Sequence, residues 1–470
     1  MYLKYLYDNE LAQASYMIGC QKTGEAMVID PSRHVNPYLQ IAEEQGFTIT
    51  GTMETHVHAD FVSGAVELSG RTGAVIYHSA EGEENGGYAF DSSLNTKGVR
   101  DKDRIHVGNV WMDVLHTPGH TPEHVSYLLT DGAHPEKPIG VFTGDFVFVG
   151  DVGRPDLLEK SVGVKDSADA GARQMFASIQ SFKQFEDYLQ IWPGHGAGSS
   201  CGKALGAVPT TTVGYEKMFN PAFQPEQEQE FVDFLLDGQP EPPAYFANMK
   251  EINKYGAEYL SEVHPPVLLS IDAEEVEKLA GDENNMIVDT RNPAAYARGH
   301  IPDTINISYP EAFTEWMGWL TEYGSDIYLI GAEADHEAMR DALYGIGMDR
   351  IAGFMPAGVV ERAGHLRTYE NITPQEMKEE KEKGNIRVLD VRFQDERERE
   401  LIPGAEHIML GHLPAGTDED LPPKDKPVAV HCGSGKRSAI AASILLNKGY
   451  DVKNMLGGMM RWKNENLEIE

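Results

Sequence analysis

Residues 48–61 read TITGTMETHVHADF, a short apolar segment that ends in metal-ligand side chains. The β-branched residues over 49–56 predict a strand. His56, His58 and Asp60 follow directly, at the end of that strand. In α/β domains the loops after strands carry the chemistry. The segment therefore predicts a layered α/β fold with a functional loop at this point.

Three further loops follow predicted strands and carry one ligand type each. One HxHxD motif is weak evidence for a metal site, but four such loops in order are strong. Imidazole and carboxylate groups at the ends of successive strands can converge on one divalent metal, and the adjacent glycines let the backbone approach closely. The three loops supply His120 in TPGHTPEH, Asp145 in FTGDF and His195 in WPGHG.

Length and charge limit the class of protein. A chain of 470 residues is long enough for about three domains. The formal net charge of −34 repels phosphate backbones and anionic membrane surfaces, so we expect no nucleic-acid or membrane partner. Only three cysteines occur and the first residues do not resemble a secretory signal, which favours a cytoplasmic protein.

The second half of the chain contains an internal duplication of about 100 residues. NMIVDTR, GHIPDTINI and DIYLIG in the first copy correspond to RVLDVR, IPGAEHIML and PVAVHC in the second. We therefore predict three domains, over residues 1–262, 263–366 and 367–470.

A reactive thiol is predicted at Cys432. In VAVHCGSGKRS a strand ends at this cysteine and a helix begins a few residues later, so the amides between them can point inward. Such a cradle stabilises a thiolate and a terminal persulfide anion. The cradle residues are Gly433, Ser434, Gly435, Lys436 and Ser438, with Arg437 as a catalytic candidate.

The four N-terminal loops resemble those of the metallo-β-lactamase superfamily over the first ~230 residues. Dinuclear hydrolases of that superfamily continue the motif as HxHxDH, whereas this chain has Phe61, which cannot ligate a second metal. The pattern is similar to the persulfide dioxygenase branch. That resemblance implies one Fe(II) per chain, bound by His56, His120 and Asp145.

The same resemblance assigns roles to residues around the metal. His58, Asp60 and His195 would orient ligands or relay protons, or would be remnants of a lost second site. Arg154, Lys203 and Tyr245 would contact the substrate, although Arg154 could instead form a structural salt bridge. Cys201 would be a persulfide-accepting thiolate favoured by the nearby Lys203, or simply a packed thiol.

The loop at Cys432 resembles the CxxGxRS loop of rhodaneses, which transfer sulfur. A cysteine phosphatase would place its arginine six positions after the cysteine, where this chain has Ser438. The first copy keeps the family frame but reads GAEADH where the nucleophile should stand, and residues 202–431 contain no cysteine. We therefore interpret it as a pseudo-rhodanese.

Taken together, the motifs are similar to persulfide dioxygenase–sulfurtransferase fusions. This implies an α/β protein, with a metallo-β-lactamase αββα sandwich followed by two rhodanese-like domains. It also implies that the iron site oxidises a low-molecular-weight thiol persulfide with O2 to sulfite, and that a Cys432 persulfide converts sulfite to thiosulfate. We expect a homo-oligomer, either a dimer or a tetramer.

Two alternatives of other classes remain open. A zinc-dependent thioester hydrolase of the glyoxalase II type shares the N-terminal scaffold, although Phe61 argues against it. A non-oxidative sulfur carrier would need only Cys432.

Overall fold

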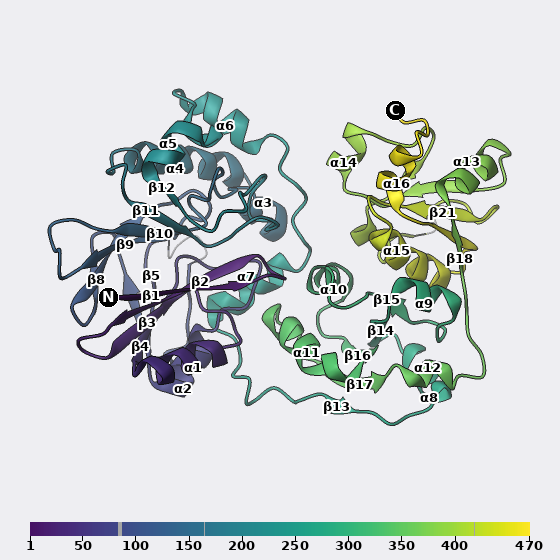
Figure 1. Ribbon diagram of the computed structural model, residues 1–470, viewed down its shortest axis with the longest axis horizontal. Helices are drawn as coiled ribbons and strands as arrows, with labels where there is room; N and C mark the ends of the chain where they lie inside the picture. The colour runs from purple at the N-terminus through teal and green to yellow at the C-terminus, as the bar shows by residue number, and fades with distance from the viewer. Residues whose placement is uncertain (83–86, 164, 418) are drawn as a thin grey trace. The chain divides into compact units, whose positions relative to one another are not determined.

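The computed structural model describes residues 1–82, 87–163, 165–417 and 419–470. The chain forms two compact units (Figure 1). The first comprises Met1–Val263 with Tyr344–Gly347, and the second comprises the remaining parts of the chain to Glu470. Within the described ranges no helix is both long and apolar enough to cross a membrane.

The first sheet of the first unit has six strands in sequence order, β1-β2-β3-β4-β5-β6. The first three pair antiparallel, and each later strand adds in parallel. The strands are β1 (Tyr2–Asp8), β2 (Gln13–Cys20), β3 (Glu25–Ile29), β4 (Thr48–Met53), β5 (Val75–Ser79) and β6 (Thr96–Val99).

The second sheet also has six strands, in the order β12-β11-β10-β9-β8-β7. Its pairings are antiparallel except between β10 and β11, which run parallel. The strands are β7 (Arg104–Val107), β8 (Val110–His116), β9 (Val125–Asp131), β10 (Gly140–Gly144), β11 (Gln190–Pro193) and β12 (Thr211–Thr212).

The two sheets pack face to face and helices cover their outer faces. Met53 of β4, Val114 of β8 and Phe142 of β10 are fully buried in the core between the sheets. Figure 1 shows α1 and α2 beside the first sheet and α4 to α6 beside the second. This αββα sandwich confirms the predicted fold. Its helices are α1 (Asn36–Gln45), α2 (Ala65–Thr72), α3 (Leu157–Val162), α4 (Ser167–Phe182), α5 (Val213–Phe219), α6 (Glu228–Leu236) and α7 (Phe246–Tyr255).

The second unit holds two five-stranded sheets of the same parallel plan, which confirms the two rhodanese-like domains. The orders are β13-β17-β16-β14-β15 and β18-β22-β21-β19-β20. The strands are β13 (Val267–Leu268), β14 (Asn285–Asp289), β15 (Ile305–Asn306), β16 (Asp326–Gly331), β17 (Ile351–Pro356), β18 (Glu370–Ile372), β19 (Arg387–Asp390), β20 (Glu406–His407), β21 (Val428–His431) and β22 (Val452–Met455).

Matching helices flank these sheets. The first helix of each repeat starts with a capping box, Asp272 with Glu275 and Thr373 with Glu376, which satisfies free N–H groups at the helix start. The helices are α8 (Ala273–Ala280), α9 (Pro293–Arg298), α10 (Phe313–Leu320), α11 (His336–Gly345), α12 (Gly358–Glu361), α13 (Pro374–Glu382), α14 (Gln394–Arg399), α15 (Lys436–Asn447) and α16 (Gly458–Asn464), with a 3-10 turn η4 (Leu410–His412).

Candidate metal centre and thiol site

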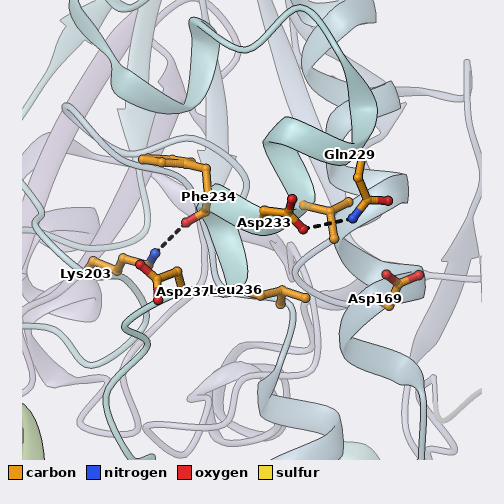
Figure 2. Close-up of a pocket in the computed structure, with 8 residues that line it drawn as sticks. Asp169, Lys203, Gln229, Asp233, Phe234, Leu236 and Asp237 are labelled. Carbon is orange, nitrogen blue, oxygen red and sulfur yellow. Dashed lines mark hydrogen bonds between the residues drawn. The ribbon is translucent and has the colours of Figure 1, made fainter.

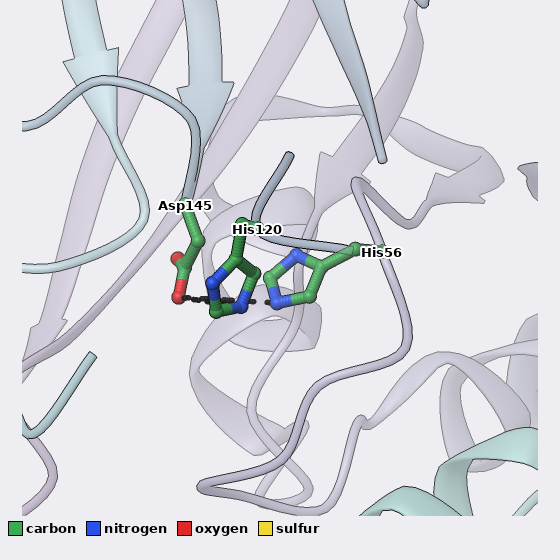
Figure 3. A group of neighbouring side chains, drawn as sticks. All are labelled: His56, His120 and Asp145. Carbon is green, nitrogen blue, oxygen red and sulfur yellow. Dashed lines mark ion pairs between the residues drawn. The ribbon is translucent and has the colours of Figure 1, made fainter. Parts of the chain in front are cut away.

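His56, His120 and Asp145 come together as one buried group (Figure 3). His56 follows β4, His120 lies between β8 and β9, and Asp145 follows β10. Their ligand atoms all lie within 4.8 Å of one another. Nε2 of His56 and Nε2 of His120 stand 3.8 and 3.6 Å from the same carboxylate oxygen of Asp145. Two imidazoles and one carboxylate in one buried group are a donor set for a divalent transition metal.

The hydrogen bonds of the two histidines direct Nε2 toward this centre. Thr55 Oγ1 donates to Asp30, so it accepts from Nδ1 of His56 at 3.0 Å. Nδ1 of His120 donates to the carbonyl of Arg154 at 2.8 Å. The proton is thereby held on Nδ1 of each ring, which leaves the Nε2 lone pair free to ligate.

Burial sets the charge state of these three residues. It lowers the pKa of His56 well below its usual value and lowers the pKa of His120 to about 3, so both rings are neutral near pH 7. It also raises the pKa of Asp145 to about 6. Nε2 of His56 and both carboxylate oxygens of Asp145 are buried without a hydrogen-bond partner among the described residues. A cation at this point would satisfy all three groups.

His124 is a buried residue beside the candidate metal group to which the sequence motifs assigned no role. Its Nε2 accepts a hydrogen bond from the backbone N–H of Asp145 at 3.1 Å, and its Nδ1 faces Thr117 Oγ1 at 2.9 Å. The ring therefore fixes the backbone of a metal ligand. In the sequence, its position four residues after His120 in the same motif was the feature that could have pointed to this role.

The three residues expected around the metal lie close to it but in two separate groups. Nε2 of His58 turns to Asp30 at 3.1 Å and to Glu54 at 3.4 Å. His195 lies 3.1 Å from Asp60 and 3.5 Å from Asp145. His58 is thus held by other carboxylates, whereas Asp60 and His195 border the metal group itself.

Cys201 joins Asp60 and His195 in a buried cluster whose ligand atoms lie within 4.8 Å. Of the two expected readings of Cys201, its surroundings favour the packed thiol over a thiolate activated by Lys203. Burial raises the pKa of Cys201 well above its usual value, and the charges of Asp60 and Asp145 raise it further. The described thiol is therefore protonated near pH 7.

Lys203 points into a different pocket, beside α6 (Figure 2). Its ammonium donates to the carbonyl of Phe234 at 2.7 Å and lies 5.2 Å from the centroid of that ring. A lysine at the last turn of a helix satisfies a free carbonyl there. Lys203 therefore caps the last turn of α6, and its expected contact with a substrate stays a prediction.

Arg154 also differs from the substrate-binding expectation. It is fully buried and makes two 2.8 Å hydrogen bonds to the carboxylate of Asp156. It also donates to the carbonyls of Ser200 and Pro240. These bonds occupy the guanidinium, so the structural alternative holds. Tyr245 is buried at the start of α7, with its ring 5.1 Å from that of Phe246.

Lys250 of α7 is a buried lysine close to the candidate metal group. It is 8% exposed, and its positive charge lowers the pKa of both His56 and His120. Burial lowers its pKa. Among the described residues, none of the hydrogen bonds or ion pairs involves its ammonium. The position suits an anionic ligand next to the metal.

In the second unit, Cys432 sits at the end of β21 and ahead of α15, as predicted from its motif. Its sulfur accepts the backbone N–H of Gly435 at 3.1 Å and lies 3.7 Å from Ser438 Oγ. Ser438 in turn donates to Asn454 at 2.7 Å. The backbone N–H of Gly435 is therefore the group that the loop offers to a sulfur anion, while Ser438 Oγ accepts from the thiol.

Arg437 does not point at the sulfur. Its guanidinium makes two hydrogen bonds to Glu396, at 2.5 and 2.7 Å, and lies 5.5 Å from the ring centroid of Phe393. Its effect on Cys432 is therefore one of charge and loop position.

The first repeat keeps the frame of this site without its nucleophile. Arg291 pairs with Asp289 and with the carbonyl of Gly299. Arg392 does the same with Asp390 and the carbonyl of Glu400. Where Cys432 follows β21, the first repeat continues from β16 into a 3-10 turn over residues 333–335.

Comparisons with known proteins identify two domain families along the chain. Residues 8–195 match the metallo-beta-lactamase superfamily, and residues 272–355 and 373–465 each match the rhodanese-like domain. A metallo-beta-lactamase structure from Staphylococcus aureus subsp. aureus COL is 46% identical, with a TM-score of 0.68, and the match covers 76% of this chain and 99% of that one. The chain therefore belongs to the metallo-β-lactamase superfamily. More particularly, it joins a metallo-β-lactamase domain to two rhodanese-like domains.

Other relatives match only the N-terminal part. A hydroxyacylglutathione hydrolase from Rhodospirillum rubrum is 31% identical over 183 residues, which are 38% of this chain and 60% of that protein. A second, from Polaromonas sp., is matched over 63% of its length, so the chain spans about three fifths of these curated relatives. The structure of ETHE1 from Myxococcus xanthus is 29% identical, with a TM-score of 0.44, over 54% of this chain and 98% of that one.

Proposed function

We propose that this protein oxidises low-molecular-weight thiol persulfides with O2 to sulfite, and then transfers sulfane sulfur to sulfite through Cys432 to give thiosulfate. The main support for this proposal is the buried group of His56, His120 and Asp145. Two histidines and one carboxylate with open positions are typical of non-haem Fe(II) oxygenases. We accordingly propose one Fe(II) per chain. Its bound form would supply open positions for O2 and an anionic sulfur ligand.

The residues around this group support a single metal. Phe61 occupies the position of the further histidine of dinuclear sites, and its ring packs 4.4 Å from that of His58. Nε2 of His58 forms a hydrogen bond with the carboxylate of Asp30. The charge of the buried Lys250 acts on His56 and His120, so its ammonium would attract a persulfide anion to this group.

The thiol site fits the second step. The thiolate of Cys432 attacks the sulfane sulfur of a persulfide, whose S–S bond breaks and releases the donor thiolate. The new persulfide on Cys432 would be stabilised by the N–H of Gly435. The sulfur lone pair of sulfite then attacks the terminal sulfur, so that thiosulfate leaves and the Cys432 thiolate returns.

A second candidate is a zinc-dependent thioester hydrolase. Relatives named hydroxyacylglutathione hydrolase match the N-terminal part at 31% identity, which favours this alternative specifically. Hydrolysis would not need O2. A non-oxidative sulfur carrier, by contrast, would use Cys432 and keep its activity without the metal group.

Product analysis tests the two-step proposal. Cys432→Ser should retain persulfide-dependent O2 uptake and release sulfite in place of thiosulfate. Cys20→Ser, a cysteine of β2 in the other unit, is the matched control and should still form thiosulfate. Thiosulfate formed by Cys432→Ser at the wild-type rate would contradict the role of Cys432. Thioester hydrolysis without any O2 uptake would favour the hydrolase.

A further inference from the structure

Both cationic residues of the Cys432 loop, Lys436 and Arg437, interact with the cysteine-free repeat. Lys436 forms an ion pair with Glu311, which lies in the loop before α10. The charge of Glu315, on α10 itself, acts on Arg437. Both glutamates belong to the repeat that has no nucleophile of its own.

A cavity of about 460 Å³ lies where the two repeats meet at this loop. The first repeat lines it with residues 292–294 and 308–311. The second repeat lines it with residues 434–436 of the active loop, among others. The amide of Gly435, which binds the Cys432 sulfur, belongs to this lining. The cavity therefore borders the sulfur cradle directly.

Helix α10 also supports the loop through aromatic packing. The rings of Trp316 and Trp319 lie 6.3 and 6.2 Å from the ring of Phe393. Phe393 in turn packs against the guanidinium of Arg437, at 5.5 Å. Arg437 is held on its other side by Glu396. The position of Arg437 thus depends on a helix of the first repeat.

The contact between the repeats is closely packed. The backbone N–H of Asn306 donates to Ser443 Oγ at 3.1 Å in a buried position, and Asn447 donates to the carbonyl of Thr304 at 2.9 Å. A Cβ at Gly411 would stand 2.4 Å from the indole of Trp319. Such packing is typical of a fixed interface and not of a flexible link.

We propose that the cysteine-free repeat is one wall of the sulfur-transfer site, and that Glu311 and Glu315 set its selectivity by neutralising Lys436 and Arg437. Glu311 pairs with Lys436 and Glu396 with Arg437, so the loop carries no surplus positive charge. The wall therefore weakens binding of dianions and favours persulfides with a single charge near the transferred sulfur. The inference rests on the proposed sulfur-transfer role of Cys432.

Alkylation of Cys432 in the full-length protein tests the wall without requiring turnover. The probes are iodoacetate, an anion, and iodoacetamide, its neutral counterpart, with the modified Cys432 peptide quantified by mass spectrometry. Glu311→Gln and Glu315→Gln should each raise the iodoacetate-to-iodoacetamide rate ratio roughly two- to fivefold, as expected for one partly exposed charge. Glu337→Gln on α11, an exposed glutamate of the same repeat, should keep the wild-type ratio.

Sulfur transfer from thiosulfate to cyanide supplies the second readout. The same two variants should lower KM for thiosulfate, a dianion, by a similar factor with little change in kcat. Wild-type alkylation ratios in both Glu311→Gln and Glu315→Gln would contradict the proposal that these glutamates set the selectivity of the site. A wild-type protein that transfers no sulfur would instead contradict the proposed function. The alkylation ratios would still test whether the cysteine-free repeat sets the charge selectivity at Cys432.

Discussion

The backbone N–H of Asp145 donates a hydrogen bond to Nε2 of the buried His124, at 3.1 Å. This bond places the carboxylate of a metal ligand through its main chain. Nδ1 of the same ring faces Thr117, so the ring is held from both sides. We therefore expect His124 to position Asp145 within the candidate metal group without ligating a metal itself.

We expect His124→Phe to lower metal affinity by roughly 10–100-fold, as for other groups that orient metal ligands. The aromatic ring is retained, so the change removes only the hydrogen bonds. Affinity is measured by competition with a chelator. His134→Phe, at a side chain that is 81% exposed, is the control. Equal affinity in His124→Phe and wild type would show that the bond has no role in metal binding.

Arg154→Ala should act on stability. Removing one partner of a buried ion pair costs up to roughly 3–5 kcal/mol, because the buried Asp156 carboxylate then keeps only the half-exposed ammonium of Lys160, at 2.8 Å. The melting temperature should fall clearly. Arg173→Ala, which breaks the exposed pairs to Asp169 and Glu228, should cost about 0–1 kcal/mol. A wild-type melting temperature with a raised KM for persulfide would instead place Arg154 at the substrate.

Lys250→Met should raise KM for an anionic persulfide by roughly tenfold or more, because a charge-assisted contact is lost. Lys250→Arg should recover part of the affinity, since the positive charge remains. Lys254→Met changes a lysine of the same helix that lies over the Tyr255 ring, and should behave as wild type. Metal content is measured alongside. An unchanged KM in Lys250→Met, with normal metal content, would refute a role in binding.

Acid should destabilise the second unit through His431. Burial lowers the pKa of His431 to about 4, from a usual value of 6.5. Between these values the unfolded chain binds a proton that the folded chain does not, so stability is lost as pH falls from about 6.5 to 4. The loss is at most about 3 kcal/mol for this residue.

The expected result is a smaller fall in the melting temperature of His431→Phe than of wild type between pH 7.5 and pH 5. Neither ring nitrogen of His431 has a hydrogen-bond partner among the described residues, and Nε2 lies 3.8 Å from the carboxylate of Asp390, so a phenyl ring removes only this longer contact. His264→Phe changes an exposed histidine of the same unit and should retain the wild-type pH dependence. The same acid sensitivity in all three proteins would exclude His431 as the cause.

Loop motifs predicted the fold and most of the metal group because each ligand directly follows a strand. The order of the loops predicted that these ligand types converge, and the family resemblance singled out His56, His120 and Asp145, which the structure brings together. The roles of Arg154 and Lys203 could not be assigned in this way, because their partners, Asp156 and the carbonyl of Phe234, are chosen by three-dimensional packing. The pKa of Cys201 likewise depends on burial among carboxylates distant in the sequence. The predicted homo-oligomer and cytoplasmic location stay predictions.

Oxygen uptake by the iron-loaded protein with a panel of thiol persulfides tests the central claim most directly. Wild type should consume O2 and form sulfite or thiosulfate, with the preferred persulfide identifying the carrier thiol. Asp145→Asn, which removes the carboxylate of the metal group, should lose this uptake but keep sulfur transfer at Cys432. No O2 uptake by wild type with any persulfide would contradict the dioxygenase assignment and place thioester hydrolysis first.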